Sequence, residues 1–492
     1  MKFLINITIG IFPLIVFSGC NQNKQQAHEK PNLLFILTDE QRYDTSAPYG
    51  NDKIKTPNLN KLGETGIVFR HAYVSQPVCS PARSTIMTGL YPHTNGVTTN
   101  NIPLEEQVRT LPEMVDSSYV SAFIGKWHLG RENDTWQGFD LRISTEGGYT
   151  SDDTTNLTDY NFWLREKEYE PDRSDKTFSR DFASGLPYEH SKSKFIELKG
   201  LKFLEQHQDQ PFLLYLSFLE PHSPNNGPFN DLHDPSLVEL DSTYQMEPDQ
   251  EMPLRYHMKR GYSYGEVSNQ KLFARYWGLV HQVDLSVGKV MEKLEELGLA
   301  ENTVVVFTSE HGKMMRKFGL TGKTVMYDVS SQVPWMMKIP GVDPVKIEQK
   351  VSQIDLVPTL LELLQQQVPA HLQGKSLVPL IKGELSANEP VFLEWNPFVN
   401  WQRQADDCPE WAAQDDCNQA VQTKIRTVVT QDGWKLNWSS SDKSQLFNLK
   451  EDPLEVNNLY YQEAYLDKIR ELKELIIQWQ EKTNDDLTYS EV

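Results

Sequence analysis

One cysteine has the neighbours that a reactive thiol needs. Cys79 opens the stretch Cys-Ser-Pro-Ala-Arg, in which Pro81 suits the first turn of a helix and puts Cys79 or Ser80 at or near the N-cap. The unpaired N–H groups and positive dipole end of such a helix favour a bound anion, and Arg83 adds a cation one turn further on. A thiol there is either a nucleophile of lowered pKa or, as is commoner for a lone cysteine, a buried and inert side chain.

Titratable side chains follow four apolar runs of strand length. The runs cover residues 32–38, 119–124, 212–218 and 303–308, and each is apolar on both faces, which is typical of a central parallel strand. The side chains that follow these runs are Asp39, Glu40, Lys126, His128, His222, Glu310 and His311. In open α/β sheets, ligands bind outside the carboxyl ends of the strands. We therefore expect these residues at one crevice, although each of them alone is more often a solvated charge or a structural histidine.

Helical and antiparallel patterns complete the prediction of the fold. Apolar residues recur at helical spacing over 279–297 and 354–364, so strands and helices alternate as in a mostly parallel central sheet flanked by helices. From residue 391 onward the pattern changes to short strands and an amphipathic helix, at 425–429, 434–438, 446–449 and 463–479. The predicted fold class is α/β, with a smaller C-terminal antiparallel sheet plus a helix.

The first 30 residues have the pattern of an export signal. Lys2 is followed by an apolar run to residue 17 and then by Ser-Gly-Cys, which resembles a bacterial lipobox. The run is short for a transmembrane span. We predict a signal peptide at 1–19 and an exported bacterial lipoprotein anchored at Cys20, periplasmic or at the cell surface, with a flexible tether over 20–30. A plain signal peptide cut nearby is the alternative.

The rest of the chain divides into a catalytic domain at 31–385 and a C-terminal α+β subdomain at 386–492. Two polar segments, 146–194 and 225–265, have little periodicity and are predicted to be long surface insertions. Such insertions either shape a substrate pocket or are decorative loops.

Composition limits the partners of the protein. The 492 residues carry a formal charge of −20, with a pI near 5.1, which argues against binding to nucleic acid or to an anionic membrane surface. With 38% hydrophobic and 24% charged residues the chain is typical of a globular protein, and we expect membrane contact only through the lipid anchor. Of the four cysteines, Cys408 and Cys417 are near enough in sequence for a local disulfide, which leaves Cys79 alone if Cys20 is lipidated.

A series of motifs resembles one enzyme family. Cys79-x-Pro81-x-Arg83, followed by Thr88-Gly89, resembles the signature of the formylglycine-dependent type I sulfatases of the alkaline-phosphatase-like superfamily. Further matches run in the family's order along nearly the whole mature chain: Thr38-Asp39-Glu40-Gln41-Arg42, Gly125-Lys126-Trp127-His128, Pro221-His222-x-Pro224, Thr308-Ser309-Glu310-His311-Gly312, Gly322-Lys323 and Leu446-Phe447-Asn448-Leu449. The resemblance implies a sulfatase-like fold and a bacterial exported carbohydrate sulfatase.

The resemblance also implies a nucleophile made after synthesis. A formylglycine-generating maturation enzyme would oxidise Cys79 to formylglycine (3-oxoalanine). One hydroxyl of its hydrate would attack the sulfur, and loss of a proton from the other would expel sulfate and restore the aldehyde. By the same resemblance His128, with Lys126 beside it, assists that deprotonation, and Arg83 holds a hydroxyl or a sulfate oxygen.

A metal site is implied at Asp39, Glu40, the formylglycine of residue 79, Glu310 and His311. Carboxylates and a hydroxyl are hard oxygen ligands, which suit Ca²⁺ or Mg²⁺. This chain has Glu40 and Glu310 where the family usually has Asp, and His311 where it often has Asn. The extra methylenes favour Ca²⁺, which tolerates irregular coordination better than Mg²⁺ does.

By the same resemblance, His222 and Lys323 complete the implied site: they contact the sulfate and protonate the leaving oxygen. Negative charge grows on the sulfate oxygens and on the leaving oxygen in the transition state, so cations are needed there.

The predicted function is hydrolysis of sulfate esters on a sulfated polysaccharide or oligosaccharide. The alternatives are a phosphatase or phosphonate monoester hydrolase of the same superfamily and, in another class, a non-catalytic lipoprotein that binds sulfated glycans. The acidic total charge does not oppose an anionic substrate, because a basic pocket inside an acidic surface attracts anions locally.

Overall fold

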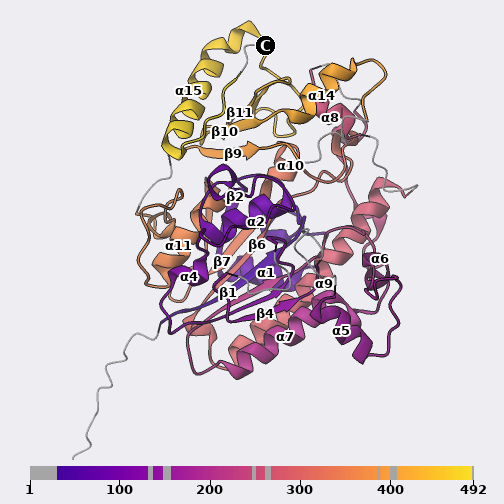
Figure 1. Ribbon diagram of the computed structural model, residues 1–492, viewed down its shortest axis with the longest axis vertical. Helices are drawn as coiled ribbons and strands as arrows, with labels where there is room; N and C mark the ends of the chain where they lie inside the picture. Colours follow the sequence, from indigo (N-terminus) through magenta and orange to yellow (C-terminus); the bar gives the residue numbers. More distant parts are fainter. Residues whose placement is uncertain are drawn as a thin grey trace, which may run out of the picture.

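Four strands of unbroken apolar sequence form the middle of an eight-stranded sheet (Figure 1). The computed structural model describes residues 30–130, 137–147, 157–246, 251–260, 267–384, 388–398 and 407–489. The strands β3 (Val120–Gly125), β5 (Phe212–Ser217), β1 (Asn32–Thr38) and β6 (Thr303–Ser309) are parallel and adjacent in that order. They confirm the four strands predicted from the apolar runs. Their carboxyl ends therefore meet at one edge of the sheet.

The outer strands make the sheet mixed. β4 (Leu141–Ser144) extends it in parallel beside β3. On the other side β7 (Gln332–Lys338) runs antiparallel to both β6 and β2 (Ile67–Tyr73), and β8 (Val345–Ser352) closes the sheet in parallel with β2. The order is β4-β3-β5-β1-β6-β7-β2-β8, and β7 alone among these eight described strands is reversed. The prediction of a mostly parallel sheet is confirmed.

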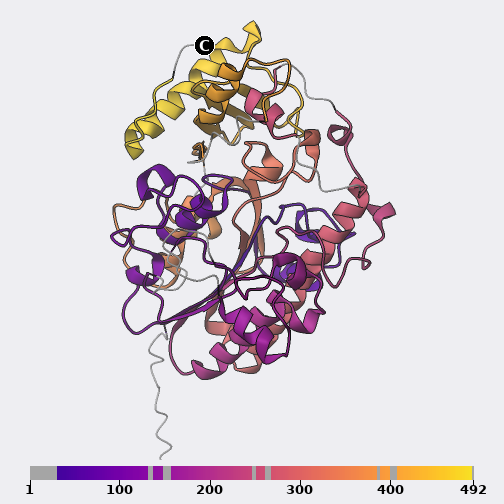
Figure 2. The ribbon, with the colours of Figure 1, turned by 45° about the vertical axis from the view of Figure 1, so that its right-hand side comes forward.

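Helices cover both faces of the sheet because its central strands are apolar on both faces (Figures 1 and 2). Leu33 and Phe35 of β1 enter one hydrophobic cluster, and Leu34 and Ile36 enter another on the opposite face. The first cluster includes residues of α2 (Cys79–Thr88), α4 (Leu111–Met114), α11 (Leu356–Leu363) and α12 (Val378–Ile381); the second includes residues of α1 (Pro57–Thr65), α7 (Lys192–Gln206) and α9 (Asn269–Glu296). The predicted helix at 279–297 is the second part of α9, and that at 354–364 is α11 with the turn before it.

A small antiparallel sheet lies beyond the central one, at the top of Figures 1 and 2. Its order is β12 (Gln445–Asn448), β11 (Trp434–Ser439), β10 (Ile425–Val429) and β9 (Val391–Trp395). The helix α15 (Leu466–Thr483) packs its apolar side on this sheet. These elements confirm the predicted C-terminal strands and helix; the predicted domain boundary at 385/386 falls on 385–387, outside the described residues.

The two predicted insertions contain short helices. The described part of 146–194 includes α5 (Asp159–Glu166) and α6 (Arg180–Ser184), which share a small hydrophobic cluster of their own, and that of 225–265 includes α8 (Leu254–Met258). The other short helices are α3 (Pro92–Asn95), α10 (Asp328–Ser331) and α14 (Gln414–Gln422).

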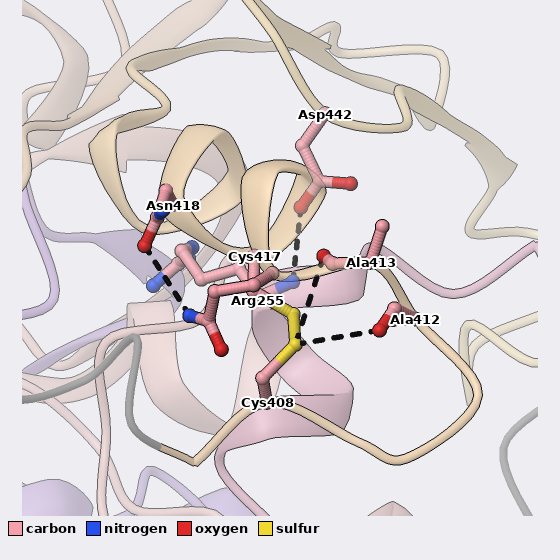
Figure 3. Close-up of a disulfide and its surroundings, with 8 residues drawn as sticks. Arg255, Cys408, Ala412, Ala413, Cys417, Asn418 and Asp442 are labelled. Atoms are coloured by element: carbon pink, nitrogen blue, oxygen red, sulfur yellow. Dashed lines mark hydrogen bonds between the residues drawn. A yellow bond between two sulfur atoms is a disulfide. The ribbon is translucent and has the colours of Figure 1, made fainter.

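Three predictions concern residues outside the described ranges: the signal peptide at 1–19, the lipid on Cys20 and nearly all of the tether. Within the ranges that the structure describes, no helix combines the length and the apolar character needed to cross a membrane. The expected disulfide joins Cys408 to Cys417 (Figure 3), and Cys79 is a buried free thiol.

Candidate active site

Cys79 is the first residue of α2, and Val78 before it is extended and serves as the N-cap residue. The thiol is 1% exposed. The hydroxyl of Ser80 donates to the backbone oxygen of His128 at 2.7 Å, which fixes the first turn of α2 against the loop after β3. The reactive residue therefore lies at a buried helix start, where backbone N–H groups and the helix dipole favour negative charge.

The loop after β3 brings Lys126 and His128 to the same place. Only glycine fits at Gly125, because a Cβ there would meet the backbone oxygen of Ser217 at 1.9 Å. Lys126 donates from Nζ to Asp39 Oδ2 at 2.5 Å. His128 has a φ of 60°, a conformation that is strained for a non-glycine residue and is often found at functional sites. Burial, with Lys126 beside it, holds the pKa of His128 well below its usual range, so the imidazole is neutral at neutral pH.

Arg83 is fixed on several sides although it is almost fully buried. Its Nη1 donates to the backbone oxygen of Lys126 at 2.6 Å and to Ser217 Oγ at 2.9 Å. Its Nε forms an ion pair with Glu310. The guanidinium therefore links the ends of β3, β5 and β6 below the thiol.

Four potential metal ligands, from Asp39, Cys79, Glu310 and His311, have donor atoms that all lie within 4.8 Å of one another. His311 Nε2 is 3.3 Å from Cys79 Sγ and 2.9 Å from Glu310 Oε1. Burial opposes its charge, but the neighbouring Glu310 carboxylate and the thiol raise the pKa of His311 to about 10. Asp39 Oδ1 is buried and makes no hydrogen bond among the described residues. Two buried carboxylates that lie against each other, one with an unused oxygen, fit a divalent cation.

Glu40 belongs to a second group, with Asp39 and His222. Its φ is 63°, and its carboxylate pairs with Lys313 at 2.7 Å and with Lys323. Burial opposes ionisation, but His222 and these two lysines hold the pKa of Glu40 well below its usual range. Glu40 is therefore at the junction between the acidic cluster and the cations, apart from the tighter group of four.

His222 and Lys323 lie together on that cationic side. His222 Nδ1 bonds the backbone oxygen of Ser223 at 2.8 Å, and its Nε2 is 3.4 Å from Lys323 Nζ and 3.3 Å from Glu40 Oε1. Burial lowers the pKa of His222 to about 4. Burial also opposes the charge of Lys323, yet the thiol of Cys79 and the Glu40 carboxylate raise its pKa well above the usual value. The lysine thus keeps its proton, and the histidine is neutral.

The structure brings all ten predicted residues into one site and adds one that the sequence did not single out. Lys313 is fully buried; it pairs with Glu40 and donates to Ser223 Oγ at 3.0 Å and to Asn225 Oδ1 at 3.1 Å. It stands two residues after His311, in the same segment that follows β6. This position in the sequence could have identified Lys313 as a site residue. A lysine at a strand end beside metal-ligand candidates is close to carboxylates, and a buried lysine needs such a partner.

Comparisons with known proteins show the family and the fold of the chain. The family model described as Sulfatase matches residues 31–366. An arylsulfatase of Clostridium perfringens is 27% identical over 481 residues, which cover 91% of this chain and 94% of the relative. An N-acetylglucosamine-6-O-sulfatase of Bacteroides thetaiotaomicron is 23% identical over 545 residues, covering 97% of this chain and 91% of the relative. The crystal structure of the phosphonate monoester hydrolase of Agrobacterium radiobacter shares the fold, with a TM-score of 0.76 at 21% identity over 92% of this chain and 96% of that one.

Proposed function

Because the chain belongs to the sulfatase family and is a sulfuric ester hydrolase, we propose that it removes sulfate from carbohydrate through a formylglycine made from Cys79. The observation that carries this proposal is the set of groups gathered around the thiol. Asp39, Glu310 and His311 offer ligand atoms within 4.8 Å of Sγ, and the neighbouring carboxylates pair with the cations Arg83, Lys126 and Lys323. Sulfate-ester cleavage needs both, a site for a divalent cation and positive charge around the sulfate oxygens.

The residues around Cys79 have the protonation states that proton transfer in this reaction requires. Cys79 Sγ stands in for the hydroxyls of the hydrated aldehyde. His128 is neutral at neutral pH and acts as the base for the hydroxyl that must lose its proton. Lys323 retains its proton and supplies it to the leaving oxygen, while the neutral His222 beside it orients the sulfate.

Asp39, Glu310, His311 and residue 79 would hold the cation, with Glu40 at the edge of the group. A bound divalent cation would polarise the oxygens of the nucleophile and of the sulfate. We propose Ca²⁺ rather than Mg²⁺, because a mixture of Asp and longer Glu side chains does not suit the near-ideal octahedron that Mg²⁺ demands.

Carbohydrate is the proposed substrate class because one relative is named as an N-acetylglucosamine-6-O-sulfatase and because residues of both polar insertions line a small cavity together with His222. A formylglycine-generating enzyme is the proposed maturation partner. Export as a lipoprotein through Cys20 also remains a proposal; the disulfide between Cys408 and Cys417 supports an oxidising compartment.

The test combines the mass of the Cys79 peptide with turnover. Protein made together with a maturation enzyme should carry the aldehyde and hydrolyse an aryl sulfate, and the Cys79→Ala variant should lose at least about a thousandfold in kcat. An unmodified thiol with no sulfate release would refute the proposal. Equal turnover by Cys79→Ala and the parent would indicate the binding-lipoprotein alternative.

A second candidate activity, hydrolysis of phosphonate monoesters, is favoured by the shared fold of the Agrobacterium radiobacter enzyme. An aryl sulfate, an aryl phosphate and an aryl phosphonate monoester should be compared on one preparation. The proposed function requires the highest kcat/KM for the sulfate, whereas a strong preference for either phosphorus ester would reverse the order of the two candidates.

A further inference from the structure

The helix α8 carries a buried cation that has no ion-pair partner among the described residues. Arg255 is 1% exposed, and its Nε, Nη1 and Nη2 make no hydrogen bond there. The guanidinium instead lies over the rings of Trp395, at 4.0 Å, and Tyr256, at 4.9 Å. The carboxylate that acts on it, Asp442, already accepts hydrogen bonds from the backbone N–H groups of Leu254 and Arg255, both at 3.0 Å.

A second cation follows directly after α8 and reaches the active site. Lys259 is partly exposed, and its Nζ donates to the hydroxyl of Thr324, the residue after Lys323. Thr324 in turn donates from its backbone N–H to the oxygen of Pro77, at 3.1 Å, two residues before Cys79. Lys259 thus contacts the segment of Lys323 directly and is joined to the segment before Cys79 through Thr324.

The charged neighbours of Lys259 are themselves cations. Burial, Arg255 and Lys323 together lower the pKa of Lys259 to about 7. In the part of the chain that the structure describes, no carboxylate forms an ion pair with Lys259.

Neighbouring segments of the C-terminal part pack against α8 and support it. Met258 packs against Cys417, and α14, which contains that cysteine, lies against α8. The disulfide closes the loop behind the helix, while Asp442 binds its first turn; Figure 3 shows the disulfide, Arg255 and Asp442 around the two helices. Arg255 and Lys259 therefore lie on or directly after a helix that its neighbours hold in place.

A partly buried cation that lies close to other cations is unfavourable unless an anion compensates its charge. A ligand can supply that anion. We propose that Lys259, with Arg255 behind it, forms a subsite for a second anionic group of the substrate, a sulfate or a carboxylate near the ester that is cleaved. This inference rests on the proposed function and adds to it a substrate class: carbohydrate with at least two negative charges. Lys259 contacts the second anion, and Arg255 acts as a positioning residue that adds fixed charge.

The test compares three substrates: a monosulfated hexose, the same hexose with two sulfates, and a monosulfated disaccharide containing a uronic acid. The parent enzyme should prefer a dianionic substrate at least tenfold in kcat/KM. Lys259→Met should reduce that preference at least tenfold, mainly through KM, and Lys259→Arg should restore most of it. Loss confined to the disulfated sugar identifies a sulfate subsite, and loss confined to the uronate identifies a carboxylate subsite.

The matched control is Lys346→Met, which removes an exposed lysine of β8 and should leave the preference unchanged. An unchanged preference in Lys259→Met, or a parent enzyme that prefers the monosulfated hexose, would overturn the inference. If the parent hydrolyses no sulfate ester, the proposed function has failed; calorimetric binding of the disulfated hexose then decides the subsite separately. Binding that weakens at least tenfold in Lys259→Met supports it, and equal binding rejects it.

Discussion

Lys313 makes the geometry of the acidic cluster depend on one buried ammonium group. It holds the Glu40 carboxylate at 2.7 Å and reaches the loop after His222 through Ser223 and Asn225. Glu40 and His222 are contributed by different strand ends, β1 and β5. Lys313 therefore acts together with Lys323 to set the distance between a metal-ligand candidate and a sulfate-contacting candidate.

Lys313→Met should lower kcat/KM for an aryl sulfate about 10–100-fold, the usual cost of losing a group that orients metal ligands. It should also raise the concentration of the proposed cation, Ca²⁺, needed for half-maximal activity, because Glu40 loses one of its two lysine partners. Activity measured against added Ca²⁺ checks both. Lys271→Met, at an exposed position of α9, is the control and should behave like the parent. A parent-like Ca²⁺ response in Lys313→Met would remove the positioning role.

At the scale of elements, a buried ionic cluster fastens the small sheet to the central body. Lys435 of β11 is fully buried and bonds Asp328 of α10 at 2.6 Å and Glu455 at 2.7 Å. Glu455 Oε2 also accepts from the backbone N–H of Asp328 at 2.6 Å. Burial raises the pKa of Glu455 to about 7. The lysine therefore compensates two carboxylates from different parts of the fold.

Lys435→Met should reduce the free energy of unfolding by about 3–5 kcal/mol, since it leaves buried carboxylates uncompensated. The loss should be smaller at pH 5 than at pH 8: the raised pKa of Glu455 means that the carboxyl is protonated at the lower pH and needs no cation. Urea unfolding at both pH values measures this. Arg470→Met, in an ion pair exposed to solvent, should change stability by less than about 1 kcal/mol. Equal losses at the two pH values would contradict the charge argument.

The same scale explains which elements were predictable. β1, β3, β5 and β6 are apolar on both faces, so local sequence suffices for them. β7 was not predicted: it contains Pro334, which lacks the N–H of a central strand and is accommodated where the register of β2 shifts between Phe69 and Ala72. β8 was not predicted because it is an edge strand with mostly polar residues.

The site, like the fold, has residues that could be predicted from the sequence and residues that could not. Its ten predicted residues stand at strand ends or in motifs that resemble a family, and these features are visible in sequence. Lys313 stands at the end of β6 beside one of these motifs, which is a weaker signal, and Arg255 and Lys259 carry no such pattern. Their surroundings come from contacts between distant segments, such as Lys259 with Thr324, and only the folded chain shows them.

At the scale of the whole molecule, the charge of −20 and the local cations act over different distances. The field of the whole surface extends about 30 Å at 0.01 M salt and about 8 Å at 0.15 M. A long polyanion meets the acidic surface, whereas a small sulfate ester meets mainly the pocket. Salt should therefore affect the two kinds of ligand in opposite ways.

Dextran sulfate should inhibit aryl sulfate hydrolysis more strongly at 0.15 M than at 0.01 M NaCl, because screening removes the long-range repulsion. The KM of the aryl sulfate should rise slightly over the same range, since its attraction is local. Inhibition constants at several salt concentrations check the prediction. Steady weakening of dextran sulfate binding with added salt would indicate a basic surface track instead.

The attachment of α8 has a consequence for how such a protein diversifies. Asp442, in the turn between β11 and β12, and the loop closed by Cys408 and Cys417 support this helix, whereas strand ends of the central sheet and α2 carry most of the reacting groups. Mutations can therefore change the support of α8 and the reacting groups of the central sheet separately during evolution. Changes in the C-terminal turn or in α14 can alter the proposed subsite for a second anion, while the groups around Cys79 stay the same in the descendants.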